Sequence, residues 1–138
     1  MKIKELMRDL IVEEIYDISL YTAEANLFGD HPVYGEAVTR LFNLLASEKR
    51  ARLKDFDRIS RERTGFRQRS IELPRSIEVA LRAHVNRTEA SVSMYFSLIK
   101  LINKPEYKEA FAGIISRERE ALVALRAMQV KIKQPAKK

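Results

Sequence analysis

Each of four amphipathic segments in this chain carries a glutamate in the middle of its apolar stripe. The clearest case is the stretch LFNLLASEKRARLKDFDRI, where Glu48 stands among apolar residues that follow the three-or-four spacing of a helix with one buried face. Those residues are Leu41, Leu44, Leu45, Phe56 and Ile59. A carboxylate on a core face is strongly unfavourable unless it is paired, protonated or bound to a metal. Any fold for this chain must therefore neutralise such acids.

The same interruption recurs in the other three segments. Glu14 interrupts the stripe of a helix expected over about residues 4–28, and Glu89 that of a helix beginning at 74–76, with Ser76 as its N-cap. Glu118 interrupts a helix that follows Asn103-Lys104-Pro105. The helix that carries Glu48 is expected over about 32–63, after the break Gly29-Asp30-His31-Pro32.

The two breaks resemble each other and divide the chain into two helical hairpins. One turn reads PVYGEA and the other PEYKEA. In the first hairpin, Glu14 and Glu48 lie 18 and 16 residues from Pro32; in the second, Glu89 and Glu118 lie 16 and 13 residues from Pro105. The acids of each hairpin should therefore lie at similar heights. This pattern predicts an all-α, antiparallel four-helix bundle over residues 1–133, with 134–138 as a basic disordered tail.

The composition limits which kinds of metal site the chain can form. The chain has no cysteine, which excludes disulfides and thiolate metal sites, and its two histidines, His31 and His84, are too few for a His-rich site. Four carboxylates at one level could be neutralised by two divalent cations, since oxygen ligands suit hard or borderline metals. The N-terminal residues are polar and no apolar run is long enough for a membrane span, so the sequence predicts a cytoplasmic protein.

This arrangement resembles the ferritin-like superfamily, and within it the rubrerythrin-type di-iron proteins. Members carry a glutamate on the first and third helices and Glu-x-x-His on the second and fourth. The resemblance implies two iron ions per chain held by Glu14, Glu48, Glu89 and Glu118. It also implies oxidoreductase activity on peroxide or dioxygen, or iron oxidation, with an external electron donor and a homodimeric assembly. Tyr21 and Tyr95 would lie just outside the ligands, as hydrogen-bond donors or as core aromatics.

The chain departs from that family at both ligand histidines, which are Ala51 and Ala121 here. Arg52 and Arg82 lie one and two helical turns from Glu48 and Glu89, so they are candidate charge partners that would neutralise the acids without metal. An alternative follows, in which the bundle is metal-free and serves as a binding or structural module.

The basic end of the second helix and the crossover that follows it, Arg58 to Arg69, supply the surface for that alternative. Nine basic residues lie between Lys49 and Arg69 against three acids, in a chain of net charge +7. This stretch suits an acidic partner, or nucleic acid bound through Arg58, Arg61, Arg63 and Arg67, although no aromatic residues interleave with it as a base-stacking platform needs.

Other polar residues have weaker claims to a site. His84 lies on or beside an apolar stripe, which is more typical of a hydrogen-bonded core histidine than of a ligand. Glu13, Asp17 and Glu120 neighbour the stripe acids but are expected on the solvent side, as reserve ligands. The sequence singles out no catalytic residue, phosphate loop or nucleophile elbow.

Overall fold

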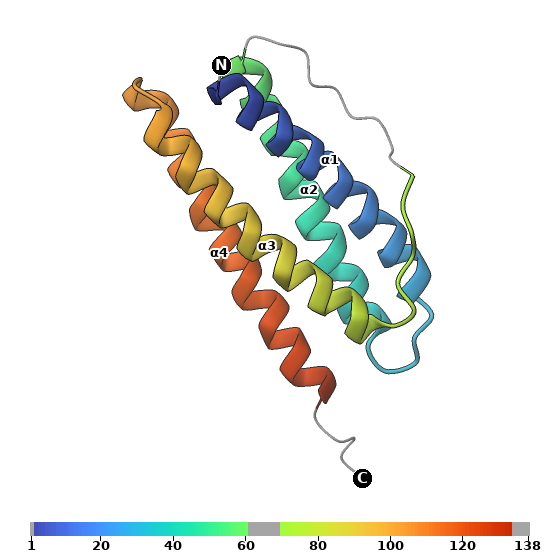
Figure 1. The fold of residues 1–138 in the computed structure, drawn as a ribbon. Helices are drawn as coiled ribbons and strands as arrows, with labels where there is room; N and C mark the ends of the chain where they lie inside the picture. The colour runs from blue at the N-terminus through green and yellow to red at the C-terminus, as the bar shows by residue number, and fades with distance from the viewer. Residues whose placement is uncertain (1, 61–69, 134–138) are drawn as a thin grey trace.

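The computed structural model describes residues 2–60 and 70–133, which form four α-helices and no β-strand. They are α1 (Lys2–Phe28), α2 (Gly35–Ser60), α3 (Ile77–Leu101) and α4 (Pro105–Lys133). α1 packs along α2 and α3 along α4, and the two hairpins meet through α1 against α3 and α2 against α4 (Figure 1). The hairpin turns lie at opposite ends of the molecule (Figure 1). The predicted all-α four-helix bundle is confirmed.

The start of α3 is fixed by a side-chain cap. Ser76 has an extended backbone, and its Oγ accepts a hydrogen bond of 3.2 Å from the amide of Val79. This bond satisfies one of the amide groups that a helix leaves unpaired in its first turn. Ser76 is thus the predicted N-cap, and Pro105, which needs no amide partner, occupies the first position of α4.

The start of α2 is built from a histidine and a glycine. His31 Nδ1 accepts hydrogen bonds from the amides of Val33 and Tyr34, at 3.2 and 3.1 Å. At Gly35 a Cβ atom would lie 2.5 Å from the carbonyl oxygen of Gly29, so only glycine allows the turn to close this tightly. Consequently α2 begins at Gly35 rather than at Pro32. Its predicted continuation to Arg63 and the predicted tail at 134–138 lie outside the described residues.

The apolar core has two large clusters and a small third one, formed by Ile15, Ile18 and Leu53 of α1 and α2. One large cluster lies towards the α1–α2 turn and includes Tyr21, Phe28, Phe42, Leu81 and Leu125. The other lies towards the α3–α4 turn and includes Leu10, Phe56, Tyr95, Leu98 and Phe111. Buried polar and charged side chains from all four helices lie along the bundle between them. Buried charged residues therefore lie between the two large apolar clusters.

The buried face of α2 differs from the predicted stripe. Phe42 is fully buried, whereas Leu44 is 57% exposed. With Phe42 and Leu45 inward, the next positions on the same face are Lys49 and Arg52, about one and two turns after Leu45, and both are buried. The prediction that Glu48 lies at the centre of the buried stripe is thus wrong, because the next residue, Lys49, takes the inward position.

No helix among the described residues combines the length and the apolarity needed to cross a membrane.

Candidate functional site: a buried ionic layer

Two of the four predicted glutamates lie at the centre of the bundle. Glu14 on α1 and Glu118 on α4 are both almost completely buried. Each glutamate lies along its helix between residues of one large apolar cluster and residues of the other, so the two lie at a similar height. Each carboxylate is therefore held away from water, where it is unstable without a positive partner.

Two cations from α2 supply that partner. Lys49 Nζ donates a hydrogen bond to Glu14 Oε1 at 2.7 Å and lies 3.5 Å from Glu118 Oε1. Arg52 Nη1 donates to Glu14 Oε2 at 3.1 Å and to Glu118 Oε1 at 2.7 Å. Both cations are buried, and together they bridge the carboxylates of opposite hairpins.

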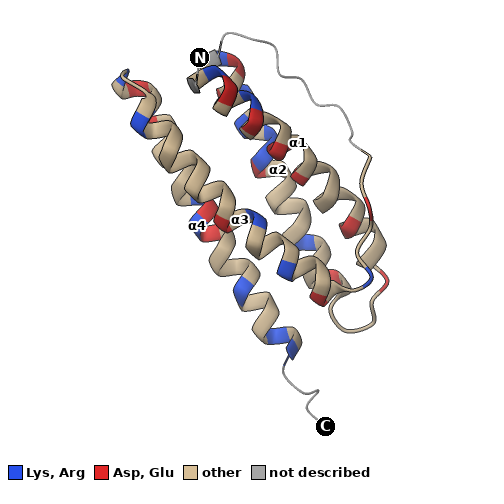
Figure 2. Ribbon diagram, in the orientation of Figure 1, with Lys and Arg blue, Asp and Glu red and all other residues tan. Residues whose placement is uncertain are grey.

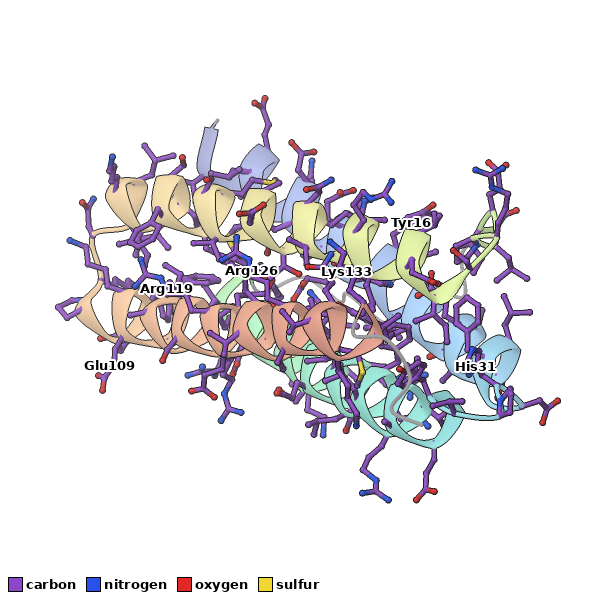
Figure 3. The ribbon with its side chains drawn as sticks, turned by 90° about the horizontal axis from the view of Figure 1, so that it is seen from below. Tyr16, His31, Glu109, Arg119, Arg126 and Lys133 are labelled. Carbon is purple, nitrogen blue, oxygen red and sulfur yellow. The ribbon has the colours of Figure 1, made fainter. Side chains whose placement is uncertain are left out.

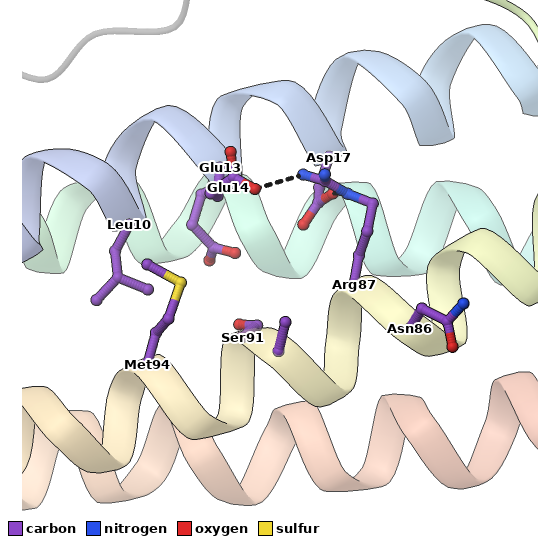
Figure 4. A pocket seen from close by; sticks show the side chains of 9 residues that line it. Leu10, Glu13, Glu14, Asp17, Asn86, Arg87, Ser91 and Met94 are labelled. Carbon is purple, nitrogen blue, oxygen red and sulfur yellow. Dashed lines mark hydrogen bonds and ion pairs between the residues drawn. The ribbon is translucent and has the colours of Figure 1, made fainter.

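A third carboxylate and a third cation extend this cluster towards the α1–α3 interface. Asp17 is buried, its Oδ2 lies 3.2 Å from Lys49 Nζ, and its Oδ1 accepts a hydrogen bond of 2.6 Å from Arg87 Nε. Arg87 also pairs with Glu13 at 3.2 Å across a cavity of about 210 Å³ (Figure 4). The prediction that Asp17 faces solvent is wrong. We call the six residues Glu14, Asp17, Lys49, Arg52, Arg87 and Glu118 the ionic layer.

The pKa values follow from this geometry. Burial alone would raise the pKa of Asp17 and of Glu118, but Lys49 and the neighbouring arginines hold both below their usual values. Burial would lower the pKa of Lys49 and of Arg52, but the surrounding carboxylates raise both. Asp17 and Glu118 are therefore held in their negative form near neutral pH, and Lys49 and Arg52 in their positive form.

The two predicted tyrosines flank the ionic layer. Tyr21 and Tyr95 are buried on its two sides, one in each apolar cluster. Burial raises the pKa of both hydroxyls, and the negative charge of Glu14 raises that of Tyr95 further. Both tyrosines therefore stay protonated. Their rings pack against aromatic neighbours, Tyr21 against Phe42 and Tyr95 against Phe56 and Phe111.

The remaining predicted residues do not join the ionic layer. Glu89 is exposed and pairs at 2.6 Å with Arg126 of α4, which is labelled in Figure 3, because Thr88 and Ser91 occupy the inward positions of α3. Arg82 is exposed as well. Glu48 is half-buried and lines a groove between α2 and α4. Arg52 is a charge partner as predicted, but for Glu14 and Glu118 rather than for Glu48.

A second buried pair joins α1 to α3. His84 Nε2 lies 2.5 Å from Glu24 Oε1, and its ring stacks on Tyr21 with centroids 3.9 Å apart. His84 is thus a hydrogen-bonded core histidine, the more typical of its two predicted roles. Glu24 was not singled out from the sequence, although it lies ten residues, close to three helical turns, after Glu14.

The donor set does not fit a pair of metal ions. Lys49 Nζ occupies the point where Glu14, Asp17 and Glu118 converge, at 2.7–3.5 Å from their oxygens. A divalent cation would need the same oxygens at about 2.0–2.6 Å and would be repelled by the ammonium group. Ala51 and Ala121 offer no ligand atoms in place of histidine. Accordingly, no group of three or more His, Cys, Asp or Glu residues in the described ranges is arranged to hold a metal.

Comparisons with family models, with curated proteins and with solved structures gave no match for this chain.

Proposed function

We propose that this chain is a metal-independent four-helix bundle that acts as a binding module for an acidic partner, through the basic end of α2 and the basic residues that follow it. One observation carries the first half of this proposal. Lys49 and Arg52 stand where a di-metal carboxylate protein would hold its ions, and they neutralise the buried carboxylates. The bundle then needs no metal to fold.

The distribution of the remaining basic residues supports the second half. Lys49 and Arg52 are buried in the ionic layer, whereas Arg50, Lys54 and Arg58 are exposed on α2, and the sequence places four further arginines directly after this helix. Those four are Arg61, Arg63, Arg67 and Arg69. A charge excess of this kind attracts anionic partners and depends strongly on salt.

Metal analysis tests the first half. We expect protein purified without chelator to contain no stoichiometric iron, manganese or zinc, and to melt at the same temperature with and without EDTA. An anaerobic ferrous titration followed by air should leave the absorption spectrum unchanged. About two irons per chain with an oxo-bridge absorption band would instead establish a di-iron oxidoreductase of the rubrerythrin type.

Charge reversal tests the second half. Retention on a poly-L-glutamate column should fall sharply with salt, and the double variant Arg61→Glu/Arg63→Glu should elute much earlier than wild type. The matched control is Lys131→Glu/Lys133→Glu at the end of α4, where the charged residues after Glu120 are all basic (Figure 2). Each double variant lowers the net charge from +7 to +3. If both double variants lost the same amount of retention, net charge alone would explain why the protein is retained. If the protein were retained more tightly on single-stranded DNA than on poly-L-glutamate, the partner would be nucleic acid rather than an acidic protein.

A further inference from the structure

The outer face formed by α3 and α4 is basic. Two contacts between these helices define it. Arg126 pairs with Glu89 at 2.6 Å, and the guanidinium carbon of Arg119 lies 5.0 Å from the centroid of the Phe96 ring. Figure 3 shows Arg119 and Arg126 on this flank of α4 and Glu109 on the opposite flank. The exposed basic residues that follow the two flanks at helical spacing are Arg82, Lys100, Lys108, Arg119, Arg126 and Lys133. We call this surface the α3–α4 face.

The α3–α4 face carries few acids. Every exposed acid of α4 lies at least about 80° round the helix axis from Arg119, and therefore outside the basic flank. The flank of α3 contributes two acids, Glu78 and Glu89, against the six bases of the face. The face therefore has an excess of positive charge, which attracts an anionic partner.

Exposed apolar side chains alternate with the bases along α4. Val123 and Val130 are 70% and 58% exposed, and each follows an exposed arginine by four residues. Steps of four and three residues keep successive side chains on one side of a helix, so bases and valines form a single stripe of about four turns. The stripe consists of Arg119, Val123, Arg126, Val130 and Lys133. A partner that complements it must offer both anionic groups and an apolar layer.

We propose that the α3–α4 face binds the surface of an anionic lipid bilayer. The basic side chains contact lipid phosphates, where each Lys or Arg adds to the attraction. Val123 and Val130 enter the boundary between headgroups and acyl chains. Nucleic acid also supplies phosphates, but it would leave both valines without an apolar partner. The Phe96 ring is covered by Arg119 and does not offer a free face for a base. The α3–α4 face is separate from the basic end of α2, so this proposal does not rest on the proposed function.

Sedimentation of the full chain with sucrose-loaded vesicles tests the face. We expect binding to phosphatidylcholine vesicles with about 30% phosphatidylglycerol to be at least about tenfold tighter than to vesicles of phosphatidylcholine alone, because only the first carry negative charge. Binding should weaken as the salt concentration rises from about 50 to about 500 mM. Absence of binding to the anionic vesicles at about 50 mM salt would overturn the proposal, and so would equal binding to both kinds of vesicle.

Charge reversal locates the contact. Arg119→Glu/Lys133→Glu on the α3–α4 face and Lys54→Glu/Arg58→Glu on α2 each lower the net charge from +7 to +3. The first double variant should bind anionic vesicles about tenfold or more weakly and keep most of its retention on poly-L-glutamate. The second should keep vesicle binding and lose retention, so failure of this proposal and failure of the proposed function give different results. Equal loss of vesicle binding in both variants would overturn the proposal, because net charge alone would explain it.

A single tryptophan reports whether the stripe enters the bilayer. The chain has no tryptophan, so Val123→Trp and its matched control Leu44→Trp, at an exposed apolar position of α2, each carry one. With anionic vesicles the emission maximum of Val123→Trp should move to shorter wavelength while that of Leu44→Trp stays, because only the first ring reaches the apolar boundary. An unshifted Val123→Trp that still sediments with the vesicles would overturn the proposal. Binding of double-stranded DNA that is tighter than vesicle binding at the same salt, and is weakened by Arg119→Glu/Lys133→Glu, would also overturn it and assign the face to nucleic acid.

Discussion

Replacement of Arg52 by methionine should lower the free energy of unfolding by about 3–5 kcal/mol, because it removes one of the two buried cations that neutralise Glu14 and Glu118. Glu118 would lose its shortest ion pair, at 2.7 Å, and Glu14 would keep only Lys49. Methionine fills a similar volume, so the loss would reflect charge rather than a cavity. Urea denaturation followed by circular dichroism measures the effect directly.

The surface provides a matched control for this variant. Arg58 pairs with Asp55 at 3.2 Å, but the two side chains are 58% and 42% exposed. Solvent screens such a pair, so Arg58→Met should cost less than about 1 kcal/mol. If both variants lost the same stability, the ionic layer would have no special role in the fold.

A double variant distinguishes the cost of leaving a buried carboxylate without its positive partner from general damage to the core. Arg52→Met combined with Glu118→Met removes both partners of one ion pair and leaves Lys49 to neutralise Glu14 and Asp17. We expect the double variant to be more stable than the sum of the single effects predicts, with a coupling of about 1–3 kcal/mol. Strict additivity would mean that the two residues act independently. An apolar pair at this site need not be less stable than the native one, because a buried ion pair often gives little net stabilisation.

The helices and their turns could be predicted because their signals are local. A serine cap, two proline-containing breaks and the three-or-four apolar spacing set α3 and α4 within a few residues. Glu14 and Glu118 could also be predicted, since the apolar residues on both sides place them on the buried face. Each of these inferences needs only the sequence of one helix.

The partners of those acids could not be predicted, because helix rotation depends on the neighbouring helices. On α2 the residues Glu48, Lys49 and Arg52 lie within a narrow arc, and packing of Phe42 rather than Leu44 decides which of them enters the core. A long basic side chain on such an arc is normally expected to extend to solvent. On α3 the small polar residues Thr88 and Ser91 displaced Glu89 from the inward face. An analysis of periodicity that counts only apolar residues does not detect inward positions occupied by polar residues.

The ionic layer also predicts how stability depends on pH. In the folded chain the pKa values of Asp17 and Glu118 are lowered, so these groups stay ionised at pH values where the unfolded chain already binds protons. Their contribution is therefore complete above the ordinary carboxyl pKa of about 4 and is lost as the pH falls through the lowered values. The raised pKa of Lys49 acts in the opposite sense, and its contribution is lost as the pH rises beyond about 10.4. Stability should therefore be highest between about pH 5 and pH 10 and fall on both sides.

Urea denaturation at a series of pH values checks this profile, and two variants assign it to particular residues. Glu118→Gln removes one buried titrating group, so its stability should fall less steeply below about pH 4.5 than that of wild type. Glu89→Gln changes a surface pair that is about half exposed, so the stability of this variant should fall at low pH in the same way as that of wild type. Salt screens buried ion pairs poorly, so the fall of stability at low pH should persist in high salt. If surface charges caused it, high salt would make this fall smaller. A metal centre would instead show acid release of metal together with unfolding, and EDTA would reproduce the loss at neutral pH. The pH profile and the chelator response therefore distinguish carboxylates neutralised by Lys49 and Arg52 from carboxylates that hold a metal.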